Sequence, residues 1–282
     1  MRYPKISVIT PSYNQGRFLE RTIQSIVCQD YPNLEYIICD GGSTDNSIEI
    51  IKKYEDRIKW WCSEKDKGQS DAINKGFKRA TGDIVCWINS DDILLDGALY
   101  EYARLFNDNP KASVFIGQTL RIDENDNVLF FYIVPKPHPF FYRNGIIRMS
   151  QQSWAWKRET IFSAIGYLNE NRHACMDIEF LMRQLRFGVK IASTDKFLGA
   201  IRLYEGTKTS NDINDENSIW SIDRKIMKKE FSDFKYLNAA PFFIFLFRLY
   251  RLINGMSLYS YFLTKRFKGY NYNHIKNRIL MF

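Results

Sequence analysis

The sequence predicts an α/β fold built on a mostly parallel sheet, and three observations support this prediction. Short runs rich in Ile and Val alternate with helical patterns over the first hundred of the 282 residues. Polar motifs directly follow three of these apolar runs. The composition, 45% apolar and 26% charged, is that of a chain that can bury a large core. In such folds ligands lie outside the carboxyl ends of the strands, so those ends hold the candidate site.

The expected elements follow from the period of the apolar residues. Short β-branched runs predict strands, and apolar residues three and four apart, such as Phe18, Leu19, Thr22 and Ile23, predict helices. In chain order we expect strand 5–10, helix 18–28, strand 35–39, helix 47–54, strand 58–62, helix 70–80, strand 83–88, strands 114–118 and 128–134, and helices 158–165 and 177–186. Strands joined through helices of this length form right-handed crossovers, which makes the first strands parallel.

The positive charge is concentrated at one end of the chain. Residues 234–282 contain eight Lys or Arg and no Asp or Glu, so the net charge of +8 belongs entirely to them. We therefore expect a main domain at 1–233, with halves 1–110 and 111–233, and a basic, aromatic, helical extension at 234–282. A formally neutral main domain argues against a nucleic-acid partner.

The extension is rich in aromatic residues over 240–282 and fits an interfacial helix on anionic lipid. Two alternatives remain open: packing on the main domain with its cations in solvent, and a homo-oligomer interface. No apolar leader precedes the first strand, and the longest apolar stretch, 239–247, is far shorter than the roughly 20 residues that a bilayer requires. We expect a cytoplasmic protein that is peripheral on the inner face of the plasma membrane.

The polar strand ends indicate a site for a nucleoside diphosphate and a divalent cation. They read TPSYN at 10–14, DGGSTD at 40–45 and NSDD at 89–92. The scattered Cys and His residues do not form a zinc site. The chain has no G-x-G-x-x-G after the first strand, which disfavours a dinucleotide fold, and no standard P-loop. Mn²⁺ or Mg²⁺, which take carboxylate and phosphate oxygens, are then the obvious means of neutralising a diphosphate.

Together with DKGQSDAINKG at 66–76, these motifs resemble family 2 glycosyltransferases of the GT-A fold, the inverting type that builds bacterial surface polysaccharides. The resemblance covers roughly residues 5–210. It implies that 1–110 binds a nucleotide-sugar, with a UDP-sugar as the expected donor, and that 111–233 forms the acceptor half. It further implies Mn²⁺ or Mg²⁺ as cofactor, and a glycan or a polyprenyl-diphosphate-linked glycan as acceptor.

The resemblance also assigns roles to individual residues. It implies that Asp91 is the metal ligand and that Asp177 is the base that deprotonates the acceptor hydroxyl. The implied substrate contacts are Pro11, Ser12 and Tyr13 around the nucleoside, Asp40 on the base edge, Gly68 and Asp71 beside the donor, Asn89 on the ribose, Trp154 on a sugar face and Lys208 on the diphosphate. The sequence departs from the family pattern at Gly41, Asn89 and Met176, where the family carries acidic residues.

Structural roles compete with several of these assignments. The alternative role for Asp91 and Asp92 is to cap a following helix, and that for Asp177 is as a helix-start carboxylate. Glu179 is a weaker candidate for the base. Asp45 is expected to cap the helix at 47. Asp71 and Asn74 lie three apart on one helical face and face either the donor or water. Trp154 with Trp156 fits core packing.

Two rival functions remain. One is a metal-using nucleotidyltransferase. The other is a degenerate transferase homologue that binds glycan or membrane without catalysis.

Overall fold

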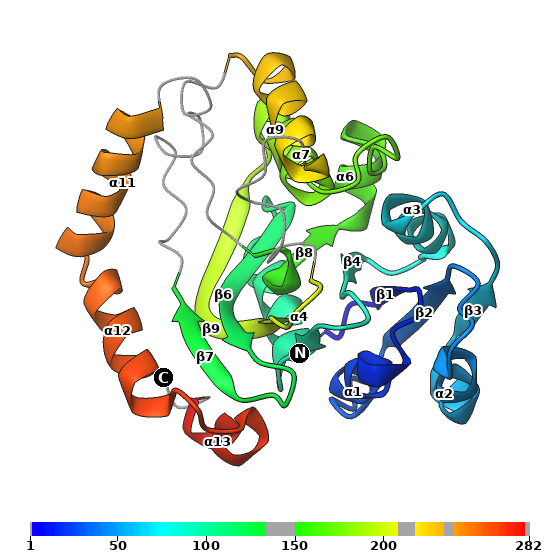
Figure 1. Cartoon of the computed structure of the whole chain (residues 1–282). Helices are drawn as coiled ribbons and strands as arrows, with labels where there is room; N and C mark the ends of the chain where they lie inside the picture. Colours follow the sequence, from blue (N-terminus) through cyan, green and yellow to red (C-terminus); the bar gives the residue numbers. More distant parts are fainter. Residues whose placement is uncertain (1, 134–149, 208–217, 234–239, 280–282) are drawn as a thin grey trace.

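The computed structural model describes residues 2–133, 150–207, 218–233 and 240–279. Within these residues one 9-stranded sheet has the order β3-β2-β1-β4-β8-β6-β9-β5, with β7 paired to β6 (Figure 1). Strands β1 to β4 are parallel, whereas β8 runs antiparallel to both β4 and β6. The strands are β1 (Ile6–Ser12), β2 (Leu34–Asp40), β3 (Trp60–Ser63), β4 (Ile84–Trp87), β5 (Ile93–Leu94), β6 (Val114–Ile122), β7 (Val128–Tyr132), β8 (Trp154–Lys157) and β9 (Ile191–Arg202).

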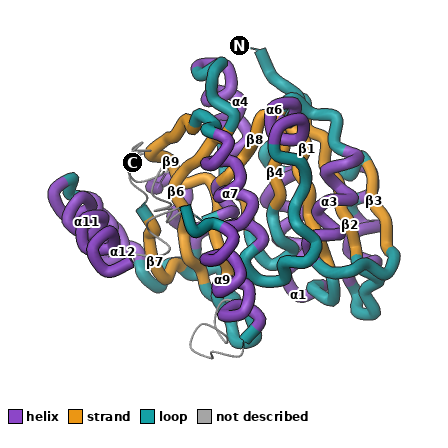
Figure 2. Tube along the Cα trace, turned by 90° about the horizontal axis from the view of Figure 1, so that it is seen from above, coloured by secondary structure: helices purple, strands orange, loops and turns teal. Residues whose placement is uncertain are grey.

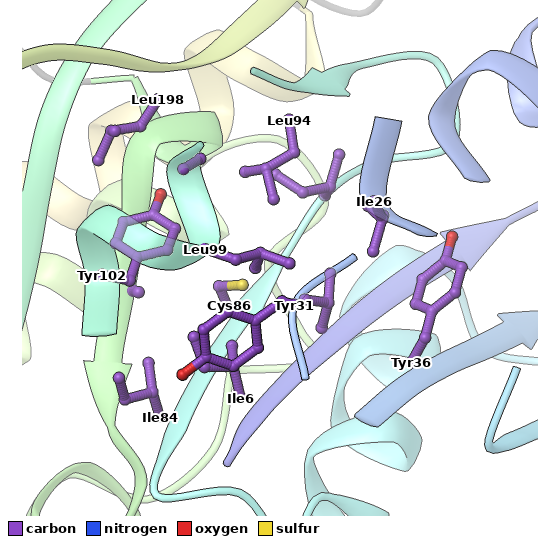
Figure 3. Packing of buried hydrophobic residues seen from close by; sticks show 14 of the residues in the cluster. Ile6, Ile26, Tyr31, Tyr36, Ile84, Cys86, Leu94, Leu99, Tyr102 and Leu198 are labelled. Carbon is purple, nitrogen blue, oxygen red and sulfur yellow. The ribbon is translucent and has the colours of Figure 1, made fainter. Parts of the chain in front are cut away.

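Helices cover both faces of the parallel part of the sheet, which explains why its strands are almost continuously apolar. Alternate residues of a strand point to opposite faces. Ile6 and Val8 of β1 therefore join a cluster with α1, α2 and α4, part of which Figure 3 shows. Ile9 joins a second cluster with α3, α6 and α7. The helices are α1 (Gly16–Val27), α2 (Ser47–Lys53), α3 (Gln69–Arg79), α4 (Ala98–Asp108), α6 (Arg158–Ala164), α7 (Met176–Phe187) and α9 (Ile219–Glu230).

Three helices follow α9: α11 (Ala240–Ile253), α12 (Met256–Phe267) and α13 (Tyr272–Ile279). Leu263 and Phe267 of α12, with Tyr272 and Ile275 of α13, share a hydrophobic cluster with Phe131 of β7. The inner faces of these two helices therefore pack on the main domain. Such packing was one of the two alternatives left open for the extension. Helix α11 lies at the outer edge of the molecule in both overall views (Figures 1 and 2). No helix in the described part of the chain combines the length and the apolarity that crossing a bilayer needs.

The expected elements are present with boundaries that differ by a few residues at most. Expected strand 5–10 is β1, expected helix 70–80 is α3, and expected helix 177–186 is α7. The sequence analysis did not predict α4, α9, β5, β8 or β9. The first half of strand β9 reads IASTDK and has no apolar run, and its long pairing with β6 holds it in the sheet.

Candidate active site

The carboxyl ends of β1, β2 and β3 lie in register, with Ser12 beside Asp40 and Asp40 beside Ser63. Asp40 is buried, and its carboxylate accepts hydrogen bonds from the backbone N–H groups of Gly42 and Ser43 and from the hydroxyls of Ser43 and Ser63. These bonds fix the turn after β2. The expected contact of Asp40 with the base edge stays a prediction, and it would have to be made alongside these four bonds.

The three residues expected around the nucleoside differ in exposure. Pro11 and Ser12 are buried, whereas the Tyr13 side chain is 61% exposed just beyond the end of β1. The Ser12 hydroxyl is buried and makes no hydrogen bond within the described part of the chain. Of the three side chains, only that of Tyr13 is exposed to solvent.

Gly41 makes room for an acidic side chain from another segment. A Cβ added at position 41 would lie 2.6 Å from the Oδ2 atom of Asp66. Asp66 is held there because its Oδ1 atom accepts a 2.8 Å hydrogen bond from the Gly68 N–H. Position 41 lacks the acidic side chain of the family pattern, but the carboxylate of Asp66, from the loop before α3, lies beside it. The sequence analysis did not single out Asp66; the small residue at Gly41 was the available signal.

The start of α3 connects this loop to the end of β4. Gly68 has φ +114°, a conformation that favours glycine, and stands at the N-terminus of the helix. Gln69 follows, and its side-chain amide donates a 2.8 Å hydrogen bond to Oδ1 of Asn89. Asp71 accepts a hydrogen bond from the Lys67 N–H, so its carboxylate also shapes the loop. The structure therefore brings Gly68 and Asn89 to one place.

The two acidic residues in the turn after β4 differ in burial and in hydrogen-bond partners. Asp92 is buried, and its carboxylate accepts hydrogen bonds from Asn89, Gln152 and the Arg202 N–H. Burial, and then the charge of Asp91, raise the pKa of Asp92 to about 7. Asp91 is half-buried, and its Oδ2 atom accepts a 3.0 Å hydrogen bond from the Tyr204 hydroxyl. The turn leads into β5 and not into a helix, so the helix-cap alternative for these residues is wrong.

Arg202, at the end of β9, fixes this turn through hydrogen bonds to Asp91 and Asp92. Its side chain is buried and donates to the carbonyl oxygens of Asp91 and Asp123 and to the carboxylate of Asp126. The guanidinium also lies over the ring of Phe18, 4.8 Å from its centre. The sequence analysis did not identify Arg202 or Tyr204, because only the pairing of β9 in the sheet brings them to the end of β4.

The turn after β4 offers one carboxylate for the divalent cation that the family resemblance implies. Asp92 is committed to protein donors, which leaves Asp91 as the carboxylate that Mn²⁺ or Mg²⁺ would use. The described residues contain no group of three or more His, Cys, Asp or Glu that could enclose a metal. Mg²⁺ commonly binds through one or two carboxylates, substrate phosphates and water, so a single well-held carboxylate suits it.

Asp177 lies in the first turn of α7 and is partly exposed. Burial of its carboxyl group raises the pKa of Asp177 above the ordinary aspartate value. A raised pKa strengthens a carboxylate as a proton acceptor. Glu179, the weaker candidate, is buried and paired with Arg183 at 2.7 Å, so it cannot serve as a solvent-accessible base.

The start of α7 is capped from outside by α9. The carboxylate of Asp223 accepts hydrogen bonds from the backbone N–H groups of His173 and Ala174 at 3.0 and 2.9 Å, and from that of Cys175 at 3.4 Å. Arg172 lies 3.8 Å from the same carboxylate and pairs with Glu230 at 2.7 Å. The turn that precedes Asp177 is therefore held in place by two acidic residues of α9.

Contacts between α3 and α7 join the two halves of the site. The Ser70 hydroxyl lies 2.8 Å from the Met176 sulfur and donates to the Arg172 carbonyl oxygen at 3.1 Å. His173 approaches the Gly68 loop, where a Cβ added to the glycine would be 3.9 Å from its Nδ1 atom. Asp177 is thus carried to the same region as Gly68 and Asn89.

Two expectations about site residues are wrong, and a third concerns a residue outside the described part of the chain. Trp154 is 1% exposed and packs edge-on against Trp156 in the core, so it cannot stack on a sugar and the core alternative is right. Asn74 faces neither donor nor water, because it bonds the backbone N–H and carbonyl of Leu168. Lys208 lies outside the described residues.

Asp45 accepts from the Ser47 N–H at the start of α2, as expected, and also from the Gly16 N–H at the start of α1.

Comparison with known proteins agrees with this geometry. The profile of glycosyl transferase family 2 matches residues 7–166, more than half of the chain. The chain belongs to glycosyl transferase family 2. TarS 1–349 of Staphylococcus aureus, solved in complex with UDP-GlcNAc, superimposes with a TM-score of 0.64 over 80% of this chain and 66% of that chain, at 20% sequence identity. This likeness is one of fold, and the expected GT-A architecture is confirmed.

Two curated relatives are more similar in sequence over shorter regions. Glycosyltransferase GlyG of Streptococcus pneumoniae is 34% identical over 160 residues, which is 54% of this chain and 51% of GlyG. The GalNAc(5)-diNAcBac-PP-undecaprenol beta-1,3-glucosyltransferase of Campylobacter jejuni is 39% identical over 100 residues, 34% of this chain and 32% of that enzyme. The chain thus matches about half or less of the length of these relatives.

Proposed function

We propose that this family 2 member transfers a sugar from a nucleotide-sugar, with a UDP-sugar as the expected donor, to a hydroxyl of a glycan acceptor with inversion. One observation carries the proposal. The turn with Asp91 and the start of α7 with Asp177 both connect to the first turn of α3, through Asn89–Gln69 and Met176–Ser70 respectively. Asp91, the proposed metal ligand, and Asp177, the proposed base, therefore lie on segments that both contact the first turn of α3.

In this proposal the donor binds along the carboxyl ends of β1, β2 and β4. Tyr13 and the Asp40 turn contact the nucleoside, and Asp66 adds a second carboxylate beside Gly41. Asp91 would hold Mn²⁺ or Mg²⁺. When bound, the cation offsets the negative charge that develops on the departing nucleoside diphosphate.

Asp177 completes the reaction on the acceptor side. Its carboxylate takes the proton of an acceptor hydroxyl while the hydroxyl oxygen attacks the anomeric carbon from the face opposite the diphosphate. The bond between that carbon and the diphosphate oxygen breaks, and its electron pair leaves with the diphosphate. A positioned base of this kind contributes about 10²- to 10⁴-fold. A single displacement inverts the configuration.

The acceptor is the least constrained part of the proposal. The Campylobacter jejuni relative is named for a glucosyl transfer to a glycan linked to undecaprenol through a diphosphate. We propose an acceptor of this class, a glycan or a polyprenyl-diphosphate-linked glycan. An acceptor on a lipid would place the reaction at the inner face of the plasma membrane.

Incubation with a panel of UDP- and GDP-sugars and Mn²⁺, with mass spectrometry of the products, tests the proposal. We expect transfer from one donor class by the wild type and none by Asp177→Asn, which should still bind UDP. Glu159→Gln, which removes an exposed carboxylate on α6, is the control and should transfer normally. Transfer by Asp177→Asn would show that the base lies elsewhere. Pyrophosphate release from a nucleoside triphosphate would favour a nucleotidyltransferase, and binding without turnover a degenerate homologue.

A further inference from the structure

Helix α11 exposes an apolar stripe to solvent. Phe242, Phe245, Leu249, Leu252 and Ile253 are between 39% and 75% exposed. Their spacing of three and four residues places them on one face of the helix. Phe247, on the opposite side of the helix, is only 6% exposed. An amphipathic helix normally buries such a stripe, so its exposure needs an explanation.

Helix α12 repeats this arrangement. Its inner face carries Leu263 and Phe267 in the cluster with β7, and the Ser260 hydroxyl donates to the carbonyl oxygen of Phe131. On the outer face Leu258 is 54% and Phe262 62% exposed. Helices α11 and α12 follow one another along the edge of the molecule in Figure 1. We call their exposed apolar side chains the docking face, which consists of Phe242, Phe245, Leu249, Leu252, Ile253, Leu258 and Phe262.

The charge around the docking face indicates which kind of partner it fits. Residues 234–282 carry eight Lys or Arg and no Asp or Glu, and Arg248, Lys265 and Arg266 are exposed on α11 and α12 themselves. Two copies of this chain meeting through the docking face would bring like charges together. An anionic surface that also accepts apolar side chains is complementary to both features.

We propose that the docking face binds the surface of a bilayer containing anionic phospholipid, with α11 and α12 lying in the interfacial region. Helices of 14 and 12 residues are too short to span a membrane but suit this position. The apolar side chains enter the boundary between head groups and acyl chains, while the Lys and Arg side chains contact the phosphates. This proposal goes beyond the transfer reaction and does not depend on it.

Co-sedimentation of the full chain with vesicles tests the proposal. Wild type should bind vesicles of equal parts phosphatidylcholine and phosphatidylglycerol, and bind pure phosphatidylcholine vesicles far less. Phe245→Ser should weaken binding to the mixed vesicles about tenfold. The matched control is Phe187→Ser at the end of α7, because Phe187 and Phe245 are 60% and 61% exposed. The control should bind as the wild type does, and thermal unfolding should show both variants folded.

The charge contribution is tested in the same assay. Lys265→Gln with Arg266→Gln should weaken binding about 30-fold, since each cation contributes about 1 kcal/mol near an anionic surface. Lys228→Gln with Lys229→Gln on α9 is the control for loss of charge elsewhere. Equal binding by Phe245→Ser and Phe187→Ser, or equal binding to both kinds of vesicle, would overturn the proposal. So would a lipid-free dimer that Phe245→Ser converts to a monomer, because a second copy would then cover the docking face.

Discussion

Replacing Asp223 with alanine should destabilise the fold and loosen the segment that carries the proposed base. The buried carboxylate of Asp223 reaches from α9 to the backbone N–H groups of His173 and Ala174, just before α7. It also lies 3.8 Å from the guanidinium of Arg172. Alanine removes all of these interactions together.

The expected loss can be worked out from these contacts. Removing a side chain that caps a helix start costs about 1 kcal/mol. Breaking a buried ion pair costs about 3–5 kcal/mol when one charge is left alone, but Arg172 keeps Glu230 at 2.7 Å, so we expect about 2 kcal/mol. A total of about 3 kcal/mol in the free energy of unfolding corresponds to a fall in Tm of about 6–12 °C for a chain of this size.

Thermal unfolding of Asp223→Ala, Asp223→Asn and Asp233→Ala measures this loss. Asparagine keeps one acceptor oxygen for the N–H groups, so its Tm should lie between those of the wild type and Asp223→Ala. Asp233 pairs with Arg186 on the surface, and its removal should cost less than about 1 kcal/mol. If the Tm of Asp223→Ala is no lower than that of Asp233→Ala, the capping role assigned to Asp223 is wrong.

Two further predictions concern the site itself. Tyr204→Phe keeps the ring beside Phe18 but removes the hydroxyl that donates to Asp91, so the Mn²⁺ concentration for half-maximal transfer should rise about tenfold at unchanged Tm; an unchanged Mn²⁺ requirement would contradict this. Burial raises the pKa of Asp177, and a base must be deprotonated, so kcat/KM should fall as pH drops through a value above about 3.9. A rate that stays constant below that pH, in protein shown to be folded, would count against Asp177.

The parallel half of the fold follows from local sequence pattern. Strands β1, β2 and β4 are buried on both faces, so they stand out as apolar runs between polar turns. The polar motifs at their ends could be placed in one region because the carboxyl ends of parallel strands meet at one edge of a sheet. Asp91 and Asp40 became candidates for this reason, and the roles that the family resemblance gives them remain predictions.

The supporting contacts could not be predicted, because they join residues that are far apart in sequence. Arg202 reaches the Asp91 carbonyl across 111 positions, and Asp223 reaches the His173 N–H across 50. No local sequence pattern predicts either contact. Trp154 shows the opposite difficulty, because an aromatic residue suits a sugar platform or a core equally well. Only its place beside Ile116 on β6 and its edge-on contact with Trp156 decide for the core.

Calorimetric titration of UDP into the protein, with and without Mn²⁺, tests most directly whether Asp91 holds the cation for the diphosphate. For the wild type we expect Mn²⁺ to tighten UDP binding about tenfold, which is within the usual range of coupling between two ligands. Asp91→Asn, which preserves the shape of the side chain, should bind UDP with the same affinity whether or not Mn²⁺ is present. If Mn²⁺ tightens UDP binding to Asp91→Asn as much as to the wild type, the role assigned to Asp91 is contradicted.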